Sequence, residues 1–166
     1  MLIRPEIAAD HTAIARINIV AFADHPHSRQ TEHLIVAALR NAGALTLSLV
    51  AEDRGEVVGH IAFSPALIDG ESRSWFILGP LAVLPERQRE GIGSRLVWAG
   101  IGEIRRLGGA GCVLVGPPGY YRRFSFRHDG GLRIEGVPPE YVLCLPLREE
   151  TPRGAVTHHP AFLADA

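Results

Sequence analysis

The chain reads Leu81-Ala82-Val83-Leu84-Pro85-Glu86-Arg87-Gln88-Arg89-Glu90-Gly91-Ile92-Gly93-Ser94-Arg95-Leu96 at the point that decides its fold. The apolar residues before Pro85 predict the end of a strand, and the two glycines open a predicted helix. Backbone N–H groups at a helix start lack partners within the helix, and the helix dipole adds partial positive charge there. Because glycine has no side chain, phosphate oxygens can approach this backbone closely. The stretch therefore predicts an anion site that fits a diphosphate; the alternative is a tight helix entry without a ligand.

The predicted strand before this loop is interrupted. Gly79-Pro80 stands inside the apolar run from Trp75 to Leu84. Proline cannot donate a hydrogen bond to a neighbouring strand, so this position is an edge, a bulge or a parting of two strands. We favour a parting, because the freed N–H and C=O groups of residues 81–83 could then pair with an extended ligand that carries amides. Pantetheine is such a ligand.

Two other phosphate-binding patterns are missing from the sequence. No Gly-x-x-x-x-Gly-Lys occurs, and Gly91-x-Gly93 lacks the third glycine of a dinucleotide fingerprint. The first absence weighs against a nucleotide hydrolase, and the second weighs against a dehydrogenase.

Composition excludes several classes of protein. The 166 residues suffice for one domain, and 46% hydrophobic with 21% charged residues argues against intrinsic disorder. Because 17 basic residues face 18 acidic ones, no overall basic field favours nucleic acid. The longest uncharged stretch has 15 residues, too short for a membrane span. Glu6 and Asp10 precede any apolar segment, and Cys112 and Cys144 are expected to be buried reduced thiols. We therefore expect a cytoplasmic protein.

Hydrophobic periodicity predicts short strands that alternate with helices. The predicted strands begin at residues 2, 45, 57, 74, 112 and 141, and the predicted helices begin at Asp10 and cover 31–41, 92–104 and 118–124. This order predicts an α/β (α+β) fold, with one mixed central sheet, helices on both faces and the parting described above. Residues 1–148 form the predicted domain. The remaining segment, 149–166, is rich in Pro, Gly and His and is expected to be a loose C-terminal tail.

At two blocks the sequence resembles the GNAT superfamily of acyl-CoA-dependent N-acyltransferases. The pyrophosphate signature of that family is met by Gln88-Arg89-Glu90-Gly91-Ile92-Gly93, directly after a strand and Pro85. The second block is met by Tyr121-Arg122-Arg123-Phe124-Ser125-Phe126, which follows the short strand 113–115. Ser125 stands where the family usually has glycine. The resemblance covers residue 2 to about 148.

The resemblance implies a set of donor-site residues and one catalytic residue. Backbone groups of Leu81 and Val83 would hold the pantetheine arm, and the amides from Arg89 to Ser94 would hold the pyrophosphate. Tyr121 would face the thioester sulfur as the catalytic residue. The implied cofactor-binding residues are Leu81, Ala82, Val83, Gln88, Arg89, Glu90, Gly91, Ile92, Gly93, Ser94 and Phe124. Nearby arginines could meet the phosphates of coenzyme A or could simply be solvated; they are Arg87, Arg89, Arg95, Arg122 and Arg123.

The sequence leaves open which residue acts as the general base. Many members of the resembling family carry a glutamate on the third strand, but residues 76–80 of this sequence contain no carboxylate. The candidates are His60, Asp24, His25 and Glu52, and each could instead be structural or solvated. Asp24, His25, His27 and His33 follow no established metal-ligand spacing, so we expect no metal. In the resembling family this loop and residues 130–140 shape the acceptor pocket.

The expected function is transfer of an acetyl group from acetyl-CoA, the cosubstrate, to a primary amine. Direct attack in a ternary complex is expected, because no cysteine stands in the two blocks to carry an acyl group. The alternative is a non-catalytic, CoA-binding regulatory module, and a third reading is a nucleotide-binding protein of another class. The acceptor (small molecule or protein amine), acyl groups other than acetyl and the oligomeric state, including a homodimer, stay open.

Overall fold

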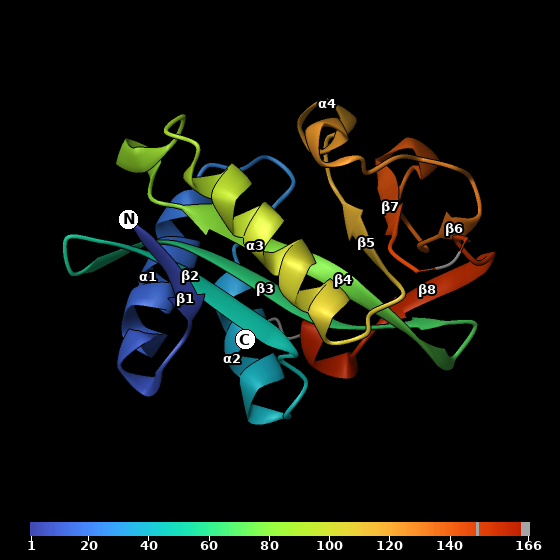
Figure 1. Cartoon of the computed structure of the whole chain (residues 1–166), viewed down its shortest axis with the longest axis horizontal. Coiled ribbons are helices and arrows are strands. Elements are labelled where there is room, and N and C mark those ends of the chain that lie inside the picture. Colours follow the sequence, from blue (N-terminus) through green and yellow to red (C-terminus); the bar gives the residue numbers. More distant parts are fainter. Residues whose placement is uncertain (149, 164–166) are drawn as a thin grey trace.

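A computed structural model describes residues 1–148 and 150–163 of the chain as one mixed sheet with helices on both faces (Figure 1). The described strands form a sheet in the order β1-β2-β3-β4-β5-β7, with β8 joined to β3 and β6 joined to β8. The strands are β1 (Leu2–Pro5), β2 (Leu47–Asp53), β3 (Glu56–Ile68), β4 (Glu71–Val83), β5 (Gly111–Val115), β6 (Leu132–Arg133), β7 (Val142–Pro146) and β8 (Gly154–His158). The α-helices are α1 (His11–Phe22), α2 (Glu32–Asn41), α3 (Ile92–Arg106) and α4 (Pro118–Tyr121). The single 3-10 turns are η1 (Ala8–Asp10), η2 (Pro85–Arg87), η3 (Arg122–Phe124), η4 (Pro139–Tyr141) and η5 (Pro160–Leu163).

Alternating leucines at positions 45, 47 and 49, followed by a turn at residues 53–56, predict a β-hairpin, which the structure confirms as β2 and β3. Asp53 pairs with Glu56 across the turn, and the two central residues, Arg54 and Gly55, have φ of 53° and 81°. Positive φ at both central positions is the geometry that matches the twist of antiparallel strands. The hairpin therefore places β2 and β3 side by side in the sheet, where both faces can be covered by helices.

The predicted parting of strands lies between β4 and β5. The two strands pair in parallel only where Trp75–Ile77 of β4 faces Gly111–Val113 of β5. Beyond Gly79, β4 stays paired with β3 up to Val83, and its register against β3 shifts between Leu78 and Leu81. β5 instead leads toward α4 (Figure 1). Among the described strands, none pairs with the edge of β4 toward β5 beyond Ile77.

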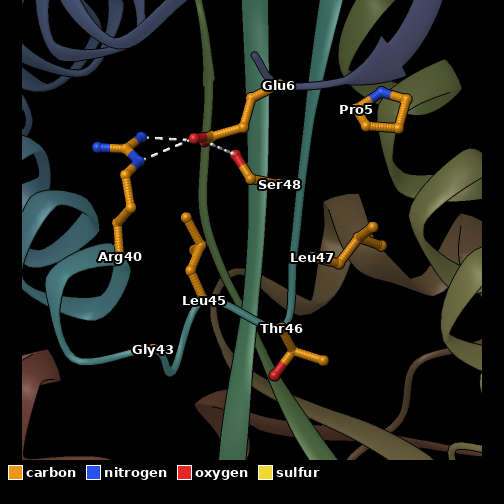
Figure 2. Close-up of a pocket in the computed structure, with 8 residues that line it drawn as sticks. All are labelled: Pro5, Glu6, Arg40, Gly43, Leu45, Thr46, Leu47 and Ser48. Carbon is orange, nitrogen blue, oxygen red and sulfur yellow. Dashed lines mark hydrogen bonds and ion pairs between the residues drawn. The ribbon is translucent and has the colours of Figure 1, made fainter. Parts of the chain in front are cut away.

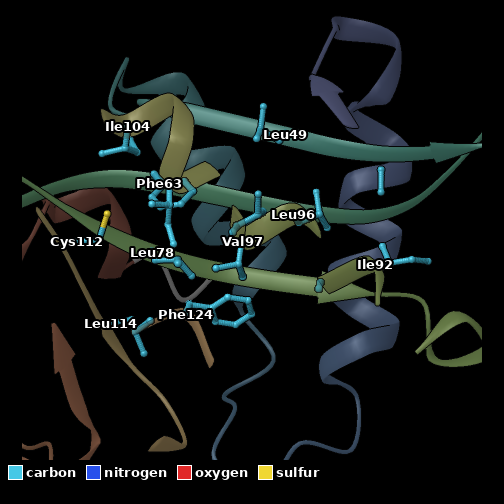
Figure 3. Close-up of a cluster of buried hydrophobic side chains, with 14 of the residues drawn as sticks. Leu49, Phe63, Leu78, Ile92, Leu96, Val97, Ile104, Cys112, Leu114 and Phe124 are labelled. Carbon is cyan, nitrogen blue, oxygen red and sulfur yellow. The ribbon is translucent and has the colours of Figure 1, made fainter. Parts of the chain in front are cut away.

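α3 covers one face of the sheet and forms the main core (Figure 3). The helical spacing of four apolar residues predicts the inner face of this helix, and all four are buried, as is Val97. The four residues are Ile92, Leu96, Ile101 and Ile104. Gly100 lets the helix backbone approach β3, because a Cβ there would lie 2.4 Å from Cε1 of Phe63. This close seat fixes the position of the whole helix, and with it the position of the helix start.

α1 and α2 lie on the other face of the sheet (Figure 1). Ile14 and Ile17 of α1 are buried as predicted. The apolar spacing predicts an inner face of α2 that consists of Leu34, Ile35, Ala38 and Leu39. Leu39 is buried as predicted, but Ile35 is only half-buried and Val36 is buried instead. Val36 packs with Ile14 and Val50, which orients the helix. No helix in the described part of the chain is both long enough and apolar enough to cross a membrane.

The prediction of a loose tail is wrong for the residues after 150. β8 pairs with β3, with Ala66 opposite His158, and with β6. The Asp69 turn fixes the new strand, because its backbone N–H donates to Ala155 O and its carboxylate accepts from Ala155 N, both at 2.9 Å. Val156 is buried in a second apolar cluster with Trp75. Residues 149 and 164–166 of the predicted tail lie outside the described residues.

Candidate functional site

The loop between β4 and α3 presents backbone N–H groups at the helix start. Gly91 is the N-cap residue and has φ of 81°, and Arg89 in the same loop has φ of 67°. A Cβ at Gly91 would meet nothing within 4 Å, so glycine is favoured there by the left-handed conformation. Arg95 N donates to Gly91 O at 3.1 Å, the first hydrogen bond of the helix. The N–H groups of residues 92–94 precede that bond and point out of the helix, as an anion site requires.

Gly93 makes room for a residue that the sequence analysis did not single out. A Cβ at Gly93 would lie 2.9 Å from the hydroxyl oxygen of Tyr120 and 3.8 Å from Cγ2 of Val83. Tyr120 belongs to α4, so its side chain spans from the β5 side of the parting to the first turn of α3. We predicted that Gly93 leaves space for phosphate, and it also leaves space for this hydroxyl. Spacing along the chain gives no signal of such a contact.

Gln88 of the pyrophosphate signature and Arg87, the residue before it, hold the loop itself. Gln88 Nε2 donates to the carbonyl oxygen of Val83 at 3.1 Å, which ties the loop to the end of β4. Arg87 pairs with Asp53 at 2.9 Å and with Glu90 at 3.1 Å. The hydrogen bonds that the Arg87 guanidinium donates to these carboxylates raise its pKa. Arg87 is therefore engaged by carboxylates, although the sequence suggested that it could meet phosphate.

The second block, which follows β5, forms a cluster of aromatic rings. The Tyr121 ring lies 6.0 Å from the Phe126 ring and 6.2 Å from the Phe124 ring, between centroids. Burial raises the pKa of Tyr121, so its hydroxyl stays protonated at neutral pH. Phe124 is buried and meets Trp98 of α3 edge-on at 5.3 Å. The block therefore connects α4 and η3 to α3.

Ser125, which stands where the family usually has glycine, keeps the backbone conformation of a glycine. Its φ is 72°, in the left-handed region that glycine adopts freely. The turn after η3 therefore keeps the conformation of a glycine turn with a serine in it.

His60 is fully buried and is held on both sides. Asn18 Nδ2 donates to Ile14 O at 3.0 Å and lies 3.2 Å from His60 Nδ1, which assigns the ring proton to Nε2. Nε2 lies 2.9 Å from Ser48 Oγ, and the Ser48 hydroxyl donates to Glu6. Burial lowers the pKa of His60 to about 4. With both nitrogens engaged, His60 is not available as a base that touches the amine.

The other candidates for the general base lie on separate elements of the chain. Glu52 accepts from Arg4 Nε at 3.2 Å, on the side of β2 that pairs with β1. Asp24 and His25 lie exposed in the loop after α1. Across residues 1–148 and 150–163, no group of three or more His, Cys, Asp or Glu side chains is arranged to hold a metal ion.

A surface pocket of about 340 Å³ lies apart from the parting (Figure 2). Its residues come from the end of β1, the end of α2 and the start of β2; they are Pro5, Glu6, Arg40, Gly43, Leu45, Thr46, Leu47 and Ser48. The Glu6 carboxylate accepts from Arg40 Nε at 2.8 Å and from Ser48. Burial raises the pKa of Glu6, but these hydrogen bonds outweigh it and hold the pKa below its usual value. This carboxylate is occupied by the protein's own groups.

A parallel strand pair that parts beside a glycine-rich helix start, with an aromatic block after the second strand, defines a class of acyl-transfer enzymes. Residues 11–124 match the acetyltransferase (GNAT) family, and the chain belongs to that family. The expectation drawn from the two sequence blocks is confirmed.

Several relatives are similar over most of their length. N-acetyltransferase YhbS of Escherichia coli K12 is 37% identical over 142 residues, which cover 82% of each chain. A crystal structure of YhbS from Escherichia coli in complex with CoA has a TM-score of 0.90 and 32% identity, over 99% of this chain and 93% of that one. A GNAT family acetyltransferase from Brucella melitensis in complex with acetyl-CoA has a TM-score of 0.88 and 46% identity, over 97% of both chains.

Proposed function

We propose that this protein transfers an acetyl group from acetyl-CoA to a primary amine by direct attack in a ternary complex. The observation that carries the proposal is the open edge of β4, which leads to a helix start with outward N–H groups. Further support comes from the Brucella melitensis and Escherichia coli relatives, whose structures are described as complexes with acetyl-CoA and CoA.

The donor would lie along the parting. Backbone groups of Leu81 and Val83 would pair with the amides of the pantetheine arm, as a further strand would. The N–H groups of residues 92–94 would bind the diphosphate, where the helix dipole favours negative charge. The thioester would then lie between β4 and β5.

Tyr121 would serve the leaving group. The neutral amine attacks the thioester carbonyl carbon, the C–S bond breaks, and the new amide nitrogen releases one proton. The sulfur leaves as a thiolate that accepts a proton or a hydrogen bond from the Tyr121 hydroxyl, and the proton released by nitrogen balances the one that the sulfur gains. Burial keeps this phenol protonated, which is the state that a donor requires. The amine must lose its proton before attack, because its ordinary pKa of about 10.4 leaves it mostly protonated at pH 7.

The cysteines favour direct attack over an acyl-enzyme. Burial raises the pKa of both Cys112 and Cys144 to about 12, so almost no thiolate is present at neutral pH. The thiolate is the nucleophilic form of cysteine. We also propose a cytoplasmic location, because both thiols are reduced in the structure and persist most readily in a reducing compartment.

A screen of primary amines with acetyl-CoA, followed by free thiol release, tests the proposal. The chain contains 17 basic residues, all of them arginine, so no lysine amine of the enzyme competes with the acceptor. We expect thiol release that depends on one class of amine and falls in Tyr121→Phe. Tight CoA binding without amine-dependent release from any member of the panel would indicate the regulatory module instead.

A further inference from the structure

Tyr120 lies with its hydroxyl against Gly93, in the first turn of α3. Its hydroxyl oxygen lies 2.9 Å from the position that a Cβ of Gly93 would occupy, beside the first turn of α3. Real Cβ atoms essentially never have so close a contact, so a side chain at position 93 would require this hydroxyl to move. Among the described hydrogen bonds of the chain, none involves the Tyr120 hydroxyl.

The Tyr120 ring is held on several sides, which limits where its hydroxyl can point. The Tyr121 and Phe124 rings pack against it edge-on, at centroid distances of 4.9 and 5.5 Å. The Arg123 guanidinium carbon lies 4.5 Å from its ring centroid. Arg123 Nε also donates to the Tyr120 carbonyl oxygen at 3.0 Å, which fixes the arginine over the ring. A hydroxyl on such a ring is preorganised for a ligand, because little side-chain freedom is left to lose.

We propose that Tyr120 is a diphosphate-binding residue, whose hydroxyl donates a hydrogen bond to a phosphate oxygen held by the N–H groups of the α3 start. The inference rests on the proposed function, since it assigns a partner to the same donor site. A phenol is a donor that suits an anionic oxygen, and hydrogen bonds to charged acceptors are the strong ones. The diphosphate would then be held from two sides, by α3 and by α4.

The two adjacent tyrosines thereby receive different tasks. Tyr120 would hold the donor through its diphosphate, at the end of the parting where α3 begins. Tyr121 would act on the sulfur, at the other end of the pantetheine arm. The alternative is that Tyr120 only packs against Phe124 and Gly93, in which case its hydroxyl would not influence the phosphates.

The experiment compares wild type with Tyr120→Phe, which keeps the ring and deletes only the hydroxyl. Tyr141→Phe is the matched control, because Tyr141 is an exposed tyrosine in η4. Calorimetric titration with CoA should show about tenfold weaker binding for Tyr120→Phe, as expected for one lost hydrogen bond to a charged group, and no change for Tyr141→Phe. The value of kcat at saturating acetyl-CoA should stay within about threefold of wild type.

A second measurement separates hydrogen bonding from packing. In ³¹P NMR of bound CoA, the diphosphate resonances should shift between wild type and Tyr120→Phe while the resonance of the 3′-phosphate stays in place. Wild-type affinity in folded Tyr120→Phe overturns the inference, and so does weaker binding with unchanged diphosphate resonances. Wild type that binds no CoA overturns the proposed function itself, which is a different outcome.

Discussion

Two glycines of α3 offer a matched test of how that helix is seated on the sheet. Gly100 faces Phe63, and a Cβ there would lie 2.4 Å from Cε1 and 2.7 Å from Cζ of the ring. Gly102 is exposed on the same helix, and a Cβ there would meet nothing within 4 Å. We predict that Gly100→Ala destabilises the protein relative to Gly102→Ala.

The magnitude follows from contact distances. Carbon atoms pack best at about 3.5–4.0 Å, so the Phe63 ring or the helix must move by about 1 Å to admit the new methyl group. Overpacking of this kind costs about 1–3 kcal/mol. Both substitutions gain up to about 1 kcal/mol of helix propensity, which cancels in the comparison. Gly100→Ala should therefore be less stable than Gly102→Ala by about 1–3 kcal/mol.

Urea unfolding of the two variants and wild type measures the difference directly. For a chain of this length each kcal/mol corresponds to roughly 2–4 °C in Tm, so thermal unfolding gives a second readout. In Gly100→Ala the displaced helix should also weaken CoA binding, because its first turn carries the proposed anion site. Equal stability of the two alanine variants would refute the close seat of α3 on Phe63.

Four further outcomes are expected. Gly93→Asp should weaken CoA binding at least tenfold, about 1.4 kcal/mol, with the fold retained. Calorimetry with Gly93→Asn as the neutral control separates the effect of charge from that of side-chain bulk. Wild-type affinity in folded Gly93→Asp would remove the segment from the donor site. Tyr121→Phe should lower kcat by about 10²-fold or less while acetyl-CoA affinity stays within a few fold, and unchanged kcat with chemistry rate-limiting would falsify its role. The pKa of His60 is about 4 in the folded chain and 6.5 in the unfolded chain, so the unfolded chain binds the proton first as the pH falls. The free energy of unfolding should therefore decrease by up to about 3 kcal/mol between pH 6.5 and 4. The pH dependence of unfolding of His60→Gln should lack this decrease. Ser125→Gly should stabilise the chain by about 1 kcal/mol in urea unfolding, since glycine accepts φ of 72° without strain, and a loss of stability would contradict that.

The sequence predicted the parts of the fold that depend on local pattern. Alternating leucines identified the hairpin, the spacing of Leu96, Ile101 and Ile104 identified the buried face of α3, and Gly79-Pro80 identified the parting of β4 from β5. These features are local, because side-chain period and the missing N–H of proline act on neighbouring residues.

The features that were missed depend on contacts between distant residues. β8 has few apolar residues, and its partner in β3 lies far back in the sequence, so its pattern resembles a loop. The contact of Gly93 with Tyr120 joins two elements across the parting, and nothing in either block states how far a phenol reaches. His60 was a fair candidate for a base until its partners, Asn18 and Ser48, were known. Burial and partners decide the pKa of a histidine, and neither can be seen in sequence spacing.

The pairing of β8 with β3 also sets an order of events during synthesis on the ribosome. Most of the main core comes from residues up to η3, although Phe126 and Leu143 complete it, so it can begin to pack while the chain is still growing. The second cluster, which contains Trp75 and Ile77, is closed by Val156 and therefore stays incomplete until that residue has left the exit tunnel. Contacts of such long sequence separation form late and leave apolar surface exposed meanwhile. A nascent chain of this protein thus exposes the apolar side chains of the second cluster until residue 156 can pair with β3.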